Sequence, residues 1–106
     1  MIENKRRSMQ KFINQMERVL YESKSEVSKI RQGIPSVWNL LRLEGVIIPE
    51  IDELLFHAKN GNIYFKYGKK QRMLMSTYLL TDSIEGLSSS QLGVEILELQ
   101  EIYNRL

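Results

Sequence analysis

The sequence contains no cysteine and a single histidine, His57. The lack of cysteine excludes disulfide cross-links, thiolate zinc sites and a cysteine nucleophile, and it fits a reducing compartment. Glu53 precedes His57 by four residues, but zinc and di-iron sites need further histidines or carboxylates. We therefore predict that the chain binds no metal and uses no cofactor.

Motifs that carry catalysis are also absent from the sequence. It has no phosphate-binding glycine loop, no nucleophile elbow and no dinucleotide fingerprint. Hydroxyl side chains crowd the stretch from Ser76 to Ser83, where we expect them to bond back to helix carbonyls or to lie at helix contacts. The sequence thus predicts a protein that is not an enzyme.

No apolar run approaches the roughly 20 residues that cross a bilayer. The first residues are positively charged but lead into no apolar segment, so we expect neither a secretory signal nor a transmembrane segment, and a cytoplasmic location. The chain has 106 residues, of which 42% are hydrophobic and 26% charged, as in ordinary soluble proteins. This size predicts a single helical domain over residues 1–106.

Proline and glycine are scarce, and neither occurs between Glu3 and Gln32. Apolar residues recur there at helical spacing, which predicts one long helix. A helix of that length spans about 45 Å at 1.5 Å per residue. Because no other expected helix is as long, part of it must overhang, bend or meet a second chain.

Glycines and prolines divide the chain after this long helix. Gly33 supplies a left-handed cap at its end. We predict a short helix over 35–44 that turns Trp38 and Leu41 inward and is closed by Gly45.

Three further segments follow this short helix. Residues 46–48 are expected to form an apolar connector, and Pro49 to begin a helix that stops at Gly61. We then predict one helix over 62–85. The alternatives are a loop with a helix start near Lys69, and a strand, because Ile63, Phe65 and Tyr67 alternate as they would in one.

The most apolar run of the chain is Met73–Leu80. On a helical spiral its apolar side chains cover nearly every side, so we expect it to be enclosed by protein, either the chain's own helices or a second copy of them. Together these segments predict an all-α fold: a small bundle of four to five helices with a long N-terminal helix.

The last helix is predicted to begin at a capping box formed by Ser88 and Gln91. Its inward face is expected to carry Leu92, Ile96, Leu99, Tyr103 and Leu106, widened by Val94, Leu97 and Ile102. Its outward face is expected to carry Glu95, Glu98, Glu101 and Asn104.

Charge is distributed unevenly along the chain. Residues 1–72 hold 14 basic and 8 acidic side chains, a balance of 14 − 8 = +6, whereas residues 73–106 hold 1 and 5, a balance of 1 − 5 = −4. Such asymmetry indicates a partner surface, or basic and acidic segments that pair within one fold or dimer. We favour the second interpretation.

Three groups of residues are candidates for partner binding. A basic and aromatic segment contains Tyr64, Lys66, Tyr67, Lys69, Lys70 and Arg72, a mixture that suits phosphates and bases but equally suits core aromatics with solvated lysines. The start of the long helix is basic, with Lys5, Arg6, Arg7 and Lys11. Trp38, the only tryptophan, is either an interface anchor or a core residue.

Three functions follow as hypotheses. We favour a non-enzymatic helical protein–protein interaction or regulatory protein that acts as a homodimer and binds an unidentified protein partner. The second is a nucleic-acid-binding accessory protein that uses residues 64–72 and the cluster from Lys5 to Lys11. The third is an enzyme with an internal pocket or a small membrane-surface or immunity-type factor.

Overall fold

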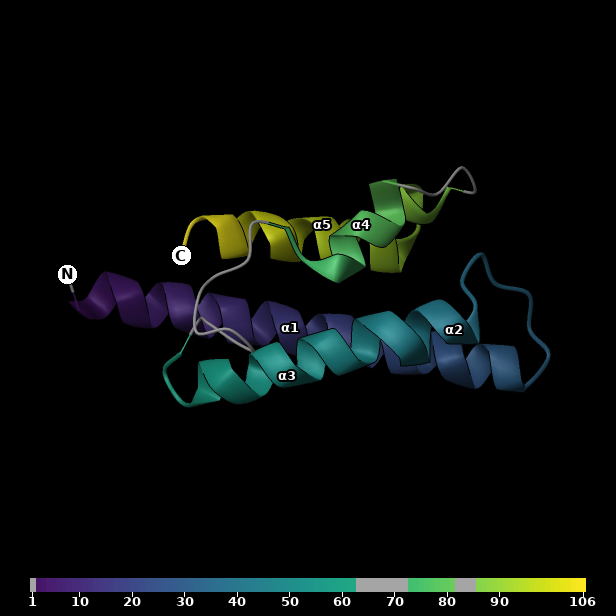
Figure 1. Cartoon of the computed structure of the whole chain (residues 1–106), viewed down its shortest axis with the longest axis horizontal. Coiled ribbons are helices and arrows are strands. Elements are labelled where there is room, and N and C mark those ends of the chain that lie inside the picture. Colours follow the sequence, from purple (N-terminus) through teal and green to yellow (C-terminus); the bar gives the residue numbers. More distant parts are fainter. Residues whose placement is uncertain (1, 63–72, 82–85) are drawn as a thin grey trace.

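The computed structural model describes residues 2–62, 73–81 and 86–106, with side chains from Arg7 onward. In chain order (Figure 1), the described elements are the α-helices α1 (Ile2–Arg31) and α2 (Leu40–Arg42), the π-helix η1 (Leu43–Ile47), the α-helices α3 (Ile48–Lys59) and α4 (Met75–Thr81), the 3-10 turn η2 (Leu87–Ser89) and the α-helix α5 (Gln91–Asn104). The predicted small all-α fold with a long N-terminal helix is confirmed, and the described residues contain no strand.

The long helix α1 lies at the centre of the fold. Figure 1 shows α3 and α5 running antiparallel to it on two sides, and both helices pack against it. Its buried apolar stripe, Phe12, Met16, Val19 and Leu20, meets the buried faces of α3 and α5 in one core. The first turns of α1 project beyond the neighbouring helices, so the expected overhang is observed (Figure 1).

Helix α1 ends as its glycine predicts. Gly33 has a φ of 81°, and the N–H of Ile34 donates to the carbonyl of Lys29 at 2.9 Å. This is a Schellman cap, which only a left-handed residue allows without strain. The same arrangement ends α3 around Gly61, where φ is 79°.

The path between these two caps differs from the expected short helix and connector. Residues 34–39 are not helical; the Asn39 side chain caps α2, and the helical path then continues without a break through η1 to the end of α3. The prediction that Gly45 closes a helix is therefore wrong. The wider turns of η1 place Pro49 in the first turn of α3, where proline is tolerated. Leu41, predicted to face inward, is 80% exposed.

The predicted continuous helix over 62–85 is also wrong. Residues 63–72 and 82–85 lie outside the described residues, but residues 73 and 74 are not helical and α4 begins at Met75. Within one chain Met73–Leu80 is not enclosed on every side, because Met75 and Tyr78 are 55% and 48% exposed, so cover by the chain's own helices alone is ruled out.

A buried carboxylate of α3 holds the start of α4. Glu50 accepts the backbone N–H groups of Met75 and Ser76 at 2.7 and 2.8 Å, and the Ser76 hydroxyl at 2.7 Å. N–H groups in the first turn of a helix lack partners within the helix, and the helix dipole favours an anion there. Glu50 therefore supplies from another helix the cap that the sequence around α4 does not provide.

Gln100 of α5 also binds the start of α4. Its Oε1 accepts the backbone N–H of Leu74 and the Thr77 hydroxyl, both at 2.8 Å. We call Glu50 and Gln100 together the α4 clamp. The hydroxyls of α4 thus follow both expectations: Ser76 and Thr77 lie at helix contacts, and Thr81 bonds back to a helix carbonyl.

Helix α5 begins two residues later than predicted. Ser90, not Ser88, is its N-cap and accepts the N–H of Gly93 at 3.1 Å, because residues 87–89 already form η2. A Cβ on Gly93 would lie 1.9 Å from the Leu87 carbonyl oxygen, so the close approach of α5 to the backbone of η2 requires glycine. Most of the predicted inward face is buried, but Val94 and Leu97 are exposed.

Candidate functional site

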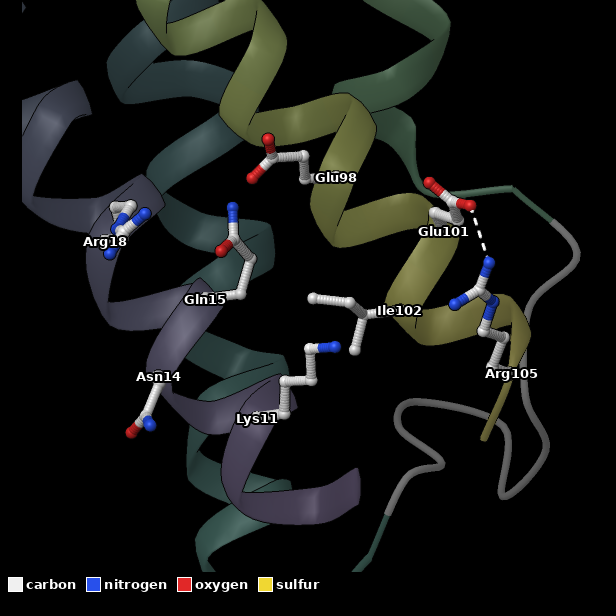
Figure 2. A pocket seen from close by; sticks show the side chains of 8 residues that line it. All are labelled: Lys11, Asn14, Gln15, Arg18, Glu98, Glu101, Ile102 and Arg105. Atoms are coloured by element: carbon white, nitrogen blue, oxygen red, sulfur yellow. Dashed lines mark hydrogen bonds and ion pairs between the residues drawn. The ribbon is translucent and has the colours of Figure 1, made fainter. Parts of the chain in front are cut away.

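A groove with a volume of about 370 Å³ lies between α1 and α5 (Figure 2). Four side chains at positions i, i+3, i+4 and i+7 line it on each side: Lys11, Asn14, Gln15 and Arg18 from α1, and Glu98, Glu101, Ile102 and the C-cap residue Arg105 from α5. This spacing covers two turns of one helix face, or about 10 Å along each helix. We call these eight residues the α1–α5 groove.

Beneath the groove lies a buried carboxylate, Glu95, which is 5% exposed. Gln15 Nε2 donates to its backbone oxygen at 2.9 Å and to its Oε2 at 2.8 Å, and Gln91 Nε2 donates to its Oε1 at 2.7 Å. Arg18 Nη1 lies 3.8 Å from Oε2. The prediction that Glu95 faces outward is wrong, because α1 supplies the amide of Gln15 and the positive charge of Arg18 at that position.

The two walls of the groove carry opposite charges. The α1 wall carries Lys11 and Arg18, and the α5 wall carries Glu98 and Glu101. Arg105 binds Glu101 at 2.8 Å. Within the described part of the chain, Lys11 and Glu98 form no hydrogen bond and no ion pair, with each other or with another residue.

Figure 2 shows Lys11 and Glu98 reaching from the two helices into the space between them. Both side chains are exposed. The groove therefore presents one cation and one anion that a molecule lying in it would contact directly. Ile102, which is partly buried, adds an apolar surface between them.

The structure places the predicted partner-binding residues in different environments. Lys11 lines the groove, and Arg7 is exposed one turn earlier on α1. Trp38 is only 4% exposed and donates through Nε1 to Ser90 Oγ at 3.2 Å, so it packs in the core. The side chains of Lys5 and Arg6 lie outside the described residues, as do Tyr64, Lys66, Tyr67, Lys69, Lys70 and Arg72.

Sequence reasoning identified only Lys11 among the groove residues. The other seven are polar or apolar flank positions of two amphipathic helices: Asn14, Gln15, Arg18, Glu98, Glu101, Ile102 and Arg105. Their regular spacing on each helix is visible in the sequence. Which flanks come together depends on the packing of α1 against α5, which the sequence does not reveal.

His57 lies elsewhere in the fold, where its ring packs edge-on against Phe56 with centroids 5.4 Å apart. Across the described ranges, no group of three or more histidine and acidic residues is placed to hold a metal ion. No described helix combines the length and hydropathy required to span a membrane. Comparison with protein-family models, curated proteins and solved structures finds no significant match for this chain.

Proposed function

We propose that this chain is a non-enzymatic helical protein that binds another protein through the α1–α5 groove. The observation that supports the proposal is a pair of opposite charges on the two walls, Lys11 and Glu98, neither of which has a hydrogen-bond or ion-pair partner among the described residues. A protein that presents a carboxylate to Lys11 and an ammonium or guanidinium group to Glu98 satisfies both. Protein surfaces carry both signs in this way.

The mixed charge of the groove disfavours a polyanion as its ligand. A nucleic-acid backbone or an anionic membrane placed against Lys11 and Arg18 would also approach Glu98 and Glu101. Like charges repel at such distances, which offsets the attraction to the basic wall. We therefore prefer a protein ligand to the nucleic-acid and membrane-surface alternatives.

Apolar side chains beside the groove add binding surface. Val94 lies one turn before Glu98 on α5, and Tyr21 follows Arg18 by three residues on α1; both are exposed. Exposed ion pairs contribute only about 0.2–1 kcal/mol each, so burial of such apolar surface is needed for stable binding. In this proposal the charges set the orientation of the partner.

Site-specific photo-crosslinking in cells of the source organism tests the proposal. Asn14 is an exposed groove residue and is replaced by a photoreactive amino acid in the full chain. Asp52, exposed on α3 and outside the groove, is the matched control position. We expect light-dependent, nuclease-resistant protein adducts from the Asn14 position only. No adduct, equal adducts from both positions, or an adduct removed by nuclease would refute the proposal.

A further inference from the structure

We propose that the protein bound in the α1–α5 groove is a second copy of this chain, related to the first by a two-fold axis along the groove. This inference rests on the proposed function. A rotation by half a turn about such an axis exchanges the two walls, so the α1 wall of one copy faces the α5 wall of the other. Because Lys11 and Arg18 lie on one wall and Glu98 and Glu101 on the other, the charge pattern of the surface is complementary to itself.

The hydrogen bond between Gln15 and Glu95 shows which residues of α1 and α5 lie side by side along the groove. The two helices are antiparallel. Lys11, which precedes Gln15 by four residues, therefore lies beside the part of α5 that follows Glu95 by about four residues. Lys11 is therefore level with the turn that contains Glu98 and Ile102. The two-fold axis preserves the position along the groove, and it brings Lys11 of each copy within about one helical turn of Glu98 of the other.

The wider charge distribution fits this pairing. The first 72 residues have a balance of 14 − 8 = +6 and the last 34 a balance of 1 − 5 = −4. In the two-fold arrangement, a basic helix from the first part meets an acidic helix from the second part twice. The exposed side chains of Tyr21 and Val94 lie on the same two helix faces, where the second copy covers them.

The molar mass of the full chain in solution, measured by sedimentation equilibrium over a concentration series, is the first readout. We expect the mass to rise from 12.5 kDa toward twice that value, with weaker association as salt is added. A constant mass of 12.5 kDa would overturn the second copy as partner. Asn14 adducts of some other mass would then still support protein binding in the groove.

Charge reversal locates the interface. In a dimer of Lys11→Glu, positions 11 and 98 are both acidic, so two acids face each other at each of the two contacts. In a dimer of Glu98→Lys both positions are basic, so two bases face each other at each contact. We expect each variant to weaken self-association at least about tenfold. Mixing the two variants restores opposite charges at both contacts, and we expect a mixed dimer with nearly the original affinity.

Lys24→Glu and Glu53→Lys are the matched controls. Both positions are exposed and outside the groove, and the net charge changes are the same. Circular dichroism checks that all four variants are folded, as expected because Lys11 and Glu98 have no partner within the described chain. A dimer that withstands both groove reversals, or a mixture that does not recover, would overturn this interface.

Discussion

Replacing Glu50 by glutamine tests how α4 is docked on the bundle. The carboxylate accepts three hydrogen bonds from the start of α4, two from backbone N–H groups and one from the Ser76 hydroxyl. Glutamine has nearly the same shape, but its amide nitrogen cannot accept. One donor of α4 therefore faces another donor, and the favourable interaction between the charge and the helix dipole is lost.

The expected cost follows from these losses. A hydrogen bond to a charged group contributes about 1.5–3 kcal/mol, and a buried donor without a partner costs about 1–3 kcal/mol. Because these two figures describe one broken contact, we expect Glu50→Gln to destabilise the docked state by about 2 kcal/mol. That free energy corresponds to a roughly 30-fold increase in local opening.

Native-state amide hydrogen exchange measures this opening directly. We expect the amides of Met75 and Ser76 to exchange roughly 30-fold faster in Glu50→Gln than in the unaltered chain. Urea unfolding followed by circular dichroism gives the global free energy. Glu53→Gln, an exposed change on the same helix, is the control and should stay within about 0.5 kcal/mol. An exchange rate in Glu50→Gln that matches this control would refute the account of the α4 clamp.

Three further substitutions, two of them compared with a control substitution, are assessed by urea unfolding. Gly93→Ala places a Cβ 1.9 Å from a backbone oxygen and should cost at least about 2 kcal/mol, whereas Gly45→Ala, whose nearest atom is a side-chain carbon at 3.6 Å, should be neutral or stabilising; equal effects would contradict the close crossing at α5. Ser90→Ala removes the α5 cap and should cost about 1 kcal/mol, whereas Ser88→Ala should cost less than about 0.5 kcal/mol; the reverse order would favour the capping box predicted from the sequence. Leu54→Ala empties a fully buried site and should cost about 2–5 kcal/mol, and a loss below about 1 kcal/mol would show that the site is not tightly packed.

The features that sequence reasoning predicted correctly are those set by local chemistry. The ends of helix α1 could be predicted because about 30 residues lack proline and glycine, and because Gly33 adopts without strain the left-handed conformation that ends a helix. The end of α3 follows from Gly61 in the same way. In both cases the deciding interactions lie within one turn of the chain.

The buried carboxylates could not be predicted by the same reasoning. Glu95 sits among donors from α1, and its partner Gln15 is 80 residues away in sequence. Glu50 meets the N–H of Ser76 across 26 residues. Hydropathy places such residues on the surface, and only the packed helices supply the partners that allow them inside.

The apolar run Met73–Leu80 shows the converse error. Its composition predicts a helix covered on all sides, but Met75 and Tyr78 are partly open while the polar Ser76 and Thr77 are buried. The α4 clamp provides partners for these two hydroxyls, so their side of the helix became the inner one. The face that α4 buries therefore combines the apolar Leu80 with two hydroxyls that have hydrogen-bond partners.

The bond between Trp38 and Ser90 gives the molecule an internal optical reporter. The hydroxyl that accepts the indole N–H also caps α5, so fraying of that helix end would change the hydration of the indole. Because Trp38 is the only tryptophan in the chain, its emission spectrum arises from one place. A red shift in tryptophan fluorescence without loss of the helical circular dichroism signal would therefore report local fraying at the N-terminus of α5, without any introduced dye.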